Sequence, residues 1–179
     1  MIYLSAGHHN KDSGAVYGVY VERDLTKEAR SLIELHLDSE QVIKDKDSET
    51  NAEYQKRIKP AGGSVVFDIH FNAAGSTASG TECFVNAKDF KDKNSLSFKM
   101  AQEICDATAN VLGIKNRGVK SETQSQHKKL GILNKNAGCS VLWEICFISS
   151  ISDMASYTRC KEDLSEAIAS ILKKYDALK

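Results

Sequence analysis

Residues 64–71 read SVVFDIHF, a run of β-branched and aromatic side chains that predicts a strong strand. The tetrapeptide PAGG at residues 60–63 marks a break before it. A second apolar run, CSVLWEICF at residues 139–147, is typical of a strand buried on both faces. Shorter runs at residues 2–5 (IYLS), 42–43 and 80–86 (GTECFVN) indicate further strands.

Amphipathic segments separate these runs and predict helices. Apolar residues recur at three- and four-residue spacing over residues 22–40, 96–112 and 164–178, and Thr50-Asn51 can cap a helix that continues to about Ile58. Alternating strands and helices favour a single α/β domain, with a mostly parallel central sheet and helices on both faces.

Composition excludes several classes of protein. With 179 residues and 41% hydrophobic content, the chain fits one soluble globular domain. Its 24 basic residues balance 24 acidic ones, which argues against a nucleic-acid partner, and no apolar run is long enough for a membrane span. Five cysteines without a C-x-x-C pair, and no basic and apolar leader after Met1, predict synthesis in the cytoplasm without a signal peptide. The oligomeric state stays open.

The polar residues that end the apolar runs are the functional candidates, because ligands of open α/β sheets bind beyond the carboxyl ends of the strands. His8 follows the first strand, His70 ends the strand at residues 64–71, and Glu22 begins the first helix. Two imidazoles and one carboxylate form a common catalytic zinc set, with a fourth position open for water. An alternative is that His8 caps a turn, Glu22 is favoured by the helix dipole, and His70 is a core histidine.

The segment AGHHNKDSGA at residues 6–15 resembles the G-H-G-G-x-D-x-G-A motif of the zinc-dependent N-acetylmuramoyl-L-alanine amidases, the amidase-3 family of cell-wall hydrolases. Further motifs follow in the family's order: VERDLT, FDIHFNA, SGTECFVN, NRGVK and VLWEICFIS. The resemblance extends from Ile2 to about Tyr175. With NRGVK and VLWEICFIS taken together as the closing region, these are five ordered motifs, which are far more specific than any one of them. The resemblance implies a phosphorylase/hydrolase-like fold.

The resemblance implies that His8, Glu22 and His70 bind Zn²⁺ and that Glu144 is the catalytic carboxylate. It also implies that residues 1–179 form a zinc amidase catalytic domain, without a separate wall-binding domain. The substrate would be peptidoglycan, cut between the lactyl group of N-acetylmuramic acid and the L-alanine of the stem peptide. The protein would act on the bacterial cell wall, either as a released phage-type endolysin or as a secreted autolysin lacking its leader.

Several nearby residues depart from the family pattern or extend it. Asp68 replaces a serine and shares a strand face with His70, so it is either an outer-shell acceptor for that histidine or a plain surface aspartate. Asn72, on the same face, is a candidate substrate contact. Arg117 and Lys120, on either side of Gly118, either face the substrate groove or are solvated surface charges, and the second interpretation is favoured. Cys146 replaces a glycine, and we expect a packed thiol on the same face as Glu144. His9, also at a glycine position, either lines the rim of the site or only packs in its loop, and loop packing is slightly favoured.

Two other functions remain open at this stage. A zinc carboxypeptidase acting on peptidoglycan peptides would need a basic residue for the terminal carboxylate, and Arg117 is the candidate. A non-catalytic wall-binding module would have the same fold, although the full set of four site residues argues against it.

Overall fold

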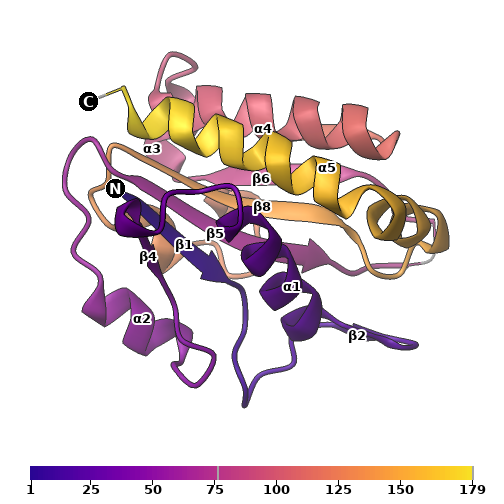
Figure 1. Cartoon of the computed structure of the whole chain (residues 1–179). Coiled ribbons are helices and arrows are strands. Elements are labelled where there is room, and N and C mark those ends of the chain that lie inside the picture. Colours follow the sequence, from indigo (N-terminus) through magenta and orange to yellow (C-terminus); the bar gives the residue numbers. More distant parts are fainter. Residues whose placement is uncertain (76, 179) are drawn as a thin grey trace.

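A computed structural model describes residues 1–75 and 77–178 of the chain. Its main feature is a six-stranded sheet in which the strand order is β4-β1-β5-β8-β6-β7 (Figure 1). The strands, in chain order, are β1 (Ile2–Ala6), β4 (Val42–Lys44), β5 (Val65–Asn72), β6 (Thr81–Val85), β7 (Asn116–Ser121) and β8 (Cys139–Phe147). A separate two-stranded hairpin, β2 (Val16–Tyr17) and β3 (Tyr20–Val21), extends from the body of the molecule.

Four neighbouring strands, β4, β1, β5 and β8, run parallel to one another. Strand β6 pairs antiparallel with β8, and β7 runs parallel to β6. The expected mostly parallel sheet is therefore confirmed, with a reversed pair at one edge. Strand β7 was not predicted, because the sequence NRGVKS has no apolar run and most of the strand is only half-buried.

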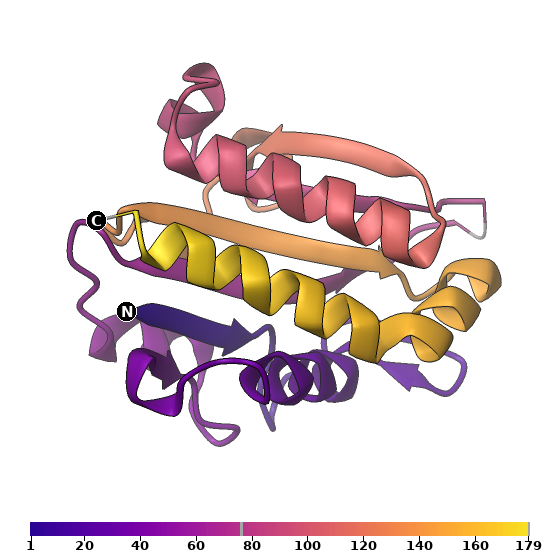
Figure 2. The same cartoon turned by 45° about the horizontal axis from the view of Figure 1, so that its top comes forward.

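Helices cover both faces of the sheet, as predicted, but unequally. Three long helices share one apolar core over one face: α1 (Glu22–Glu34), α4 (Leu96–Leu112) and α5 (Ile151–Asp176). Helices α4 and α5 lie side by side along this face (Figure 2). The other face carries a smaller cluster, where α2 (Asn51–Arg57) and the short η3 (Gly131–Asn134) pack on the sheet. The remaining short helices are α3 (Ala87–Lys91), η1 (Ser39–Gln41) and η2 (Glu122–Gln124).

Two predicted helices have different bounds in the structure. The helix expected over residues 22–40 ends at Glu34, and Leu35, just beyond it, is 78% exposed. The helix expected over residues 164–178 is the end of α5, which begins at Ile151. The Ser150 hydroxyl caps this earlier start by accepting a hydrogen bond from the Asp153 backbone N–H.

The larger core is centred on the strands that the sequence indicated most clearly. Phe67 of β5 stacks on Trp143 of β8, with their ring centroids 5.6 Å apart, and both side chains are almost fully buried. Burying an aromatic side chain of this kind contributes about 2–3 kcal/mol. Both strands are therefore held rigidly up to the carboxyl edge where His70 and Glu144 lie. No helix within the described residues is both long and apolar enough to cross a membrane.

Candidate metal centre

Three side chains from separate elements meet beyond the carboxyl ends of β1 and β5. His8 follows β1, His70 lies near the end of β5, and Glu22 is the first residue of α1. Glu22 Oε1 lies 3.0 Å from His8 Nε2 and 3.0 Å from His70 Nδ1. One donor atom of each residue lies within 4.8 Å of the others, which is close enough for one metal ion to bind all three.

The β2–β3 hairpin returns Glu22 to this point. The backbone N–H of Glu22 donates to the Ala15 carbonyl, and the Ala15 N–H donates to Glu22 Oε2 at 2.8 Å. The other carboxylate oxygen accepts the backbone N–H of Phe71. Glu22 is therefore fixed by backbone donors on both sides, and its side chain is 5% exposed. Its place at the start of α1 also suits an acid near the positive end of the helix dipole.

His8 belongs to a tight turn. Its φ of +71° lies in the left-handed region, and His9 and Asp12 close the turn with a pair of backbone hydrogen bonds. His8 Nδ1 lies 2.9 Å from Asp12 Oδ2, while Asp12 Oδ1 accepts the Gly14 N–H. A Cβ on Gly14 would lie 2.5 Å from the His8 ring, and φ at Gly14 is +61°. Asp12 and Gly14 thus define the position of His8.

His70 is held from the sheet. Its Nε2 lies 3.2 Å from Asp68 Oδ2, and the other oxygen of Asp68 accepts a hydrogen bond from the Ser5 hydroxyl on β1. A Cβ on Gly7 would lie 2.4 Å from the His70 ring, so only glycine allows the ring this position. The period-two prediction that Asp68 and His70 share a face is confirmed, and the contact fits the outer-shell interpretation.

The site is strongly coupled electrostatically. Burial lowers the pKa of His8 and of His70, but the neighbouring carboxylates reverse the effect: Glu22 raises the pKa of His8, and Asp68 with Glu22 raises that of His70 well above 6.5. Burial likewise raises the pKa of Glu22, yet hydrogen bonds from the two histidines hold it far below its usual value. In this arrangement Glu22 is a carboxylate over the whole physiological range, so it is a competent anionic ligand.

Glu144 lies beside this cluster on β8, directly opposite His70 in the β5–β8 register. Its Oε2 is buried and has no hydrogen-bond partner among the described residues. Burial raises the pKa of Glu144 to about 7, with a smaller opposing effect from His70. A carboxylate with one free oxygen beside two imidazoles is suited to accept and release a proton.

These four residues line one pocket of about 360 Å³. The predicted substrate contact Asn72 also lines this pocket, whereas Arg117 lines an adjoining hollow. Glu82 joins the two, because Asn72 Nδ2 donates to Glu82 Oε1 at 3.0 Å and Arg117 Nε donates to Glu82 Oε2 at 2.6 Å. Sequence reasoning missed Glu82, although it is an acid inside an apolar run, TECFV, as Glu144 is inside CSVLWEICF.

The segment between β7 and η3 completes the pocket and was also missed. Its pocket-lining residues are Gln124, Ser125, Gln126, His127 and Leu130. Glu122 fixes this segment: its Oε2 accepts the Leu130 N–H at 2.7 Å and the Asn134 side-chain amide at 2.9 Å. His127 of this segment is exposed and also lines the pocket.

Cys146 does not share the face of Glu144. The β5–β8 register shifts between His70 and Asn72, which interrupts strict alternation along the end of β8. The Cys146 thiol packs on the helix side instead, 3.9 Å from Met154 Sδ on α5. The prediction of a packed thiol is confirmed, since Cys146 is fully buried and free. The half-buried His9 lies in the turn beside His8.

An α/β sheet with a His–Glu–His cluster at the carboxyl ends of parallel strands, next to a carboxylate with a free oxygen, defines the class of metal-dependent hydrolases. The sequence matches the family described as N-acetylmuramoyl-L-alanine amidase (Amidase_3) over residues 2–174. The chain therefore belongs to the amidase-3 family, and the resemblance found in its motifs is confirmed.

Known proteins agree with this assignment. A crystal structure of the putative N-acetylmuramoyl-L-alanine amidase from Neisseria meningitidis is 30% identical, with a TM-score of 0.75 over 97% of this chain and 93% of that one. The N-acetylmuramoyl-L-alanine amidase from Clostridium difficile 630 shares the fold, with 19% identity and a TM-score of 0.78 over 99% of this chain and 97% of that one. The N-acetylmuramoyl-L-alanine amidase LytC of Bacillus subtilis is 24% identical over 93% of this chain, which spans about a third (34%) of LytC.

Proposed function

We propose that residues 1–179 are the catalytic domain of a zinc-dependent N-acetylmuramoyl-L-alanine amidase. The reaction is hydrolysis of the amide between the lactyl group of N-acetylmuramic acid and L-alanine of the peptidoglycan stem peptide. The observation that carries the proposal is the convergence of His8, Glu22, His70 and Glu144 in one pocket of a chain that belongs to the amidase-3 family. Its place of action is the bacterial cell wall, as a lysin or an autolysin.

The residues fit a zinc ion. Two imidazole nitrogens and one carboxylate oxygen form a donor set that catalytic zinc sites use. The outward nitrogen of each histidine already lies against a carboxylate, Asp12 or Asp68, which fixes the ring and leaves the inward nitrogen for the ion. When bound, zinc supplies a Lewis acid for the carbonyl oxygen and lowers the pKa of a water molecule in its open position.

Glu144 then acts as the proton carrier. Its free Oε2 takes a proton as water attacks the carbonyl carbon, and it returns the proton to the amine of L-alanine as the C–N bond breaks. The pKa of about 7 that burial gives this group keeps its two protonation states close in free energy near neutral pH, and a nearby cation would favour the ionised base. The same carboxylate can therefore serve both steps.

The decisive experiment replaces Glu144 with its isostere, Glu144→Gln. We expect the variant to fold, to bind zinc as wild type does, and to lose release of stem peptides from purified cell walls, since the amide cannot accept the proton. Elemental analysis measures zinc, and mass spectrometry of the soluble products measures intact stem peptides with free N-terminal alanine. Glu40→Gln, on the exposed η1 helix, is the matched control and should retain full activity.

Other products would point to the alternatives. Full activity of Glu144→Gln would reject the role of Glu144. Stem peptides shortened at their carboxyl ends, still attached to the glycan, would identify a carboxypeptidase. Wall binding by wild type without any soluble product would indicate a non-catalytic module.

A further inference from the structure

A second hollow, of about 210 Å³, adjoins the pocket of the metal centre at the β7 edge of the sheet. Its lining residues are Glu82, Phe84, Arg117, Lys120 and Gln124. Three of them, Glu82, Phe84 and Gln124, also line the pocket that contains Glu144. The two hollows therefore form one groove, which crosses β8, β6 and β7 in that order and ends at two basic side chains.

A bulge in β7 aims both basic side chains into this groove. In a regular strand, residues three apart point to opposite faces of the sheet, so Arg117 and Lys120 would diverge. Thr81 pairs with Asn116 but Cys83 pairs with Val119, which means that β7 contains one extra residue here. Gly118 adopts a φ of +77° at the bulge, and Asn116 Oδ1 accepts its N–H. The extra residue returns Lys120 to the face of Arg117.

The charge of this end of the groove is positive. Arg117 is paired with Glu82 and lies over the Phe147 ring, 5.0 Å from its centroid, so its guanidinium is fixed in place. Lys120 forms no ion pair with any carboxylate in residues 1–75 and 77–178. The hollow is therefore lined by two cations, Arg117 and Lys120, and one buried acid, Glu82, which leaves one positive charge in excess. Both basic residues are half-buried, and there a charge-assisted hydrogen bond to a ligand is worth more than in open solvent.

The distance between Glu144 and the two basic side chains indicates which part of the substrate they contact. Adjacent strands lie about 4.8 Å apart, which places β7 about 10 Å from Glu144 on β8, across β6. Each extended residue spans about 3.3 Å, so a stem peptide leaving Glu144 along the groove reaches β7 within about three residues. Long basic side chains cover part of that distance. The stem peptide supplies carboxylates in this region, whereas the glycan sugars beside the scissile bond are neutral.

We propose that Arg117 and Lys120 bind the carboxylate of the acidic residue that follows L-alanine in the stem peptide. Arg117, held by its ion pair with Glu82, forms the end of the groove, and Lys120 supplies the positive charge that is not paired with an acid of the described residues. The inference rests on the proposed amidase function and adds a substrate preference to it: stem peptides with a free carboxylate at the second residue are cut in preference to those in which it is amidated.

The test compares two soluble muropeptides that differ only in that group, carboxylate or carboxamide. Wild type should show the higher kcat/KM for the carboxylate, and Lys120→Gln should reduce the ratio of the two values about fivefold, through KM. Lys115→Gln removes the same charge from the exposed residue just before β7, outside the hollow, and is the control. It should leave the ratio unchanged.

An unchanged ratio in Lys120→Gln would overturn the proposal. An equal reduction in Lys115→Gln would also overturn it, because the effect would then come from long-range attraction between positively charged groups of the protein surface and the substrate. A binding measurement separates this result from failure of the amidase function. Calorimetry with Glu144→Gln protein and the acidic or amidated peptide needs no turnover. Preferential binding of the acidic peptide that depends on Lys120 supports the site even without hydrolysis, and equal binding of both peptides rejects it.

Discussion

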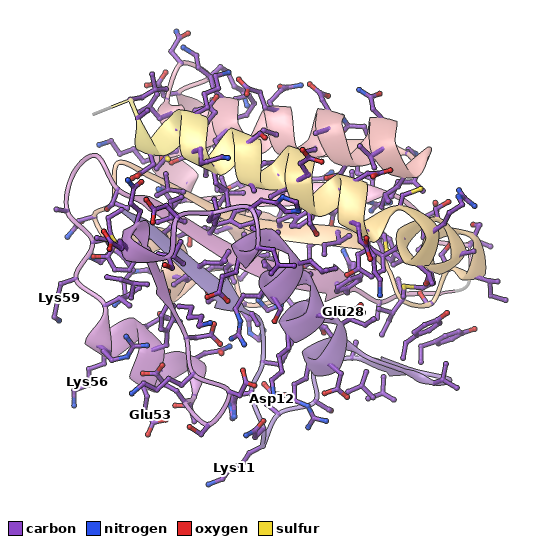
Figure 3. The ribbon with its side chains drawn as sticks, in the orientation of Figure 1. Lys11, Asp12, Glu28, Glu53, Lys56 and Lys59 are labelled. Atoms are coloured by element: carbon purple, nitrogen blue, oxygen red, sulfur yellow. The ribbon has the colours of Figure 1, made fainter. Side chains whose placement is uncertain are left out.

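The two sides of the metal centre are constructed from different kinds of structure. His70 lies on a central strand, and its partner Asp68 is 11% exposed and also hydrogen-bonded to Ser5 on the neighbouring strand. His8 lies in a turn with a left-handed backbone, and its partner Asp12 is 47% exposed, at the outer edge of the molecule beside Lys11 (Figure 3). Each histidine has one carboxylate behind it, but only one of these carboxylates is held by the core.

Rigidity in the site originates mainly on the sheet side. Glu22 Oε1 contacts both histidines, so it couples the sheet side to the loop side. The sheet side inherits its position from packed neighbours, whereas the loop side depends on a few local hydrogen bonds that water can replace. Equal ligands can therefore differ in what their removal does to the fold.

The largest expected effect tests that distinction directly. His70→Ala and His8→Ala should both lose bound zinc and at least about a hundredfold in activity, because even outer-shell partners cost ten- to a hundredfold. Their metal-free stabilities should differ. His70→Ala should lower the free energy of unfolding by about 1–3 kcal/mol, because it deprives the buried Asp68 of a partner. His8→Ala should change it by less than about 0.5 kcal/mol.

Elemental analysis measures zinc in these variants, and urea denaturation of the metal-free proteins measures stability. Equal stability losses would show that the loop is as integral to the fold as the strand. Zinc retained by either variant would remove that histidine from the ligand set.

The next effect is on the pH dependence of zinc affinity. Zinc binds neutral imidazole, and the carboxylates raise the pKa of both histidines above 6.5, that of His70 further. Protons therefore compete with zinc below the raised values, and affinity should fall on acidification by up to about a hundredfold per pH unit when two protons are taken up. A chelator competition series at decreasing pH measures this, and an affinity that stays constant through the acid range would contradict it.

Asp68→Asn should have a smaller effect, a zinc affinity about ten- to a hundredfold weaker, since the amide orients the His70 ring poorly and no longer supports its basicity. It should also move the onset of acid release to lower pH, because the charge that raises the pKa of His70 is gone. The same competition titration measures both quantities. An affinity equal to wild type would reduce Asp68 to a structural partner of Ser5.

Strand direction decides which residues of this site could be predicted from the sequence. His8, His70 and Glu144 end or nearly end parallel strands, and parallel strands bring their carboxyl ends to one edge, so their gathering was predictable. Glu82 was not, because β6 runs in the opposite direction and presents a residue near its start to the same pocket. Nothing in an alternation of strands and helices reveals that reversal.

Irregular backbone hid the remaining features. The bulge at Gly118 changes which residues of β7 share a face, and the register shift at the end of β5 moves Cys146 to the helix side. A period-two argument fails at both positions, since each depends on pairing with a distant strand. Helix α5 begins well before its predicted start. The sequence does not reveal this first part of the helix, because its inward apolar residues Met154 and Tyr157 are too sparse to form a clear pattern.

The smallest expected effect is at Asp12, and it decides whether the two sides of the centre are unequal. Asp12→Asn keeps a side-chain oxygen for the Gly14 N–H but removes the charge behind His8. Because Asp12 is half-exposed, water can solvate the His8 N–H in its place, and we expect zinc affinity to fall less than about tenfold. The comparison with Asp68→Asn uses the same chemical change at both outer carboxylates, so any difference between them reports burial. If both variants lose affinity equally, the charge on the carboxylate governs each histidine, and the rigidity of the sheet adds nothing to metal binding.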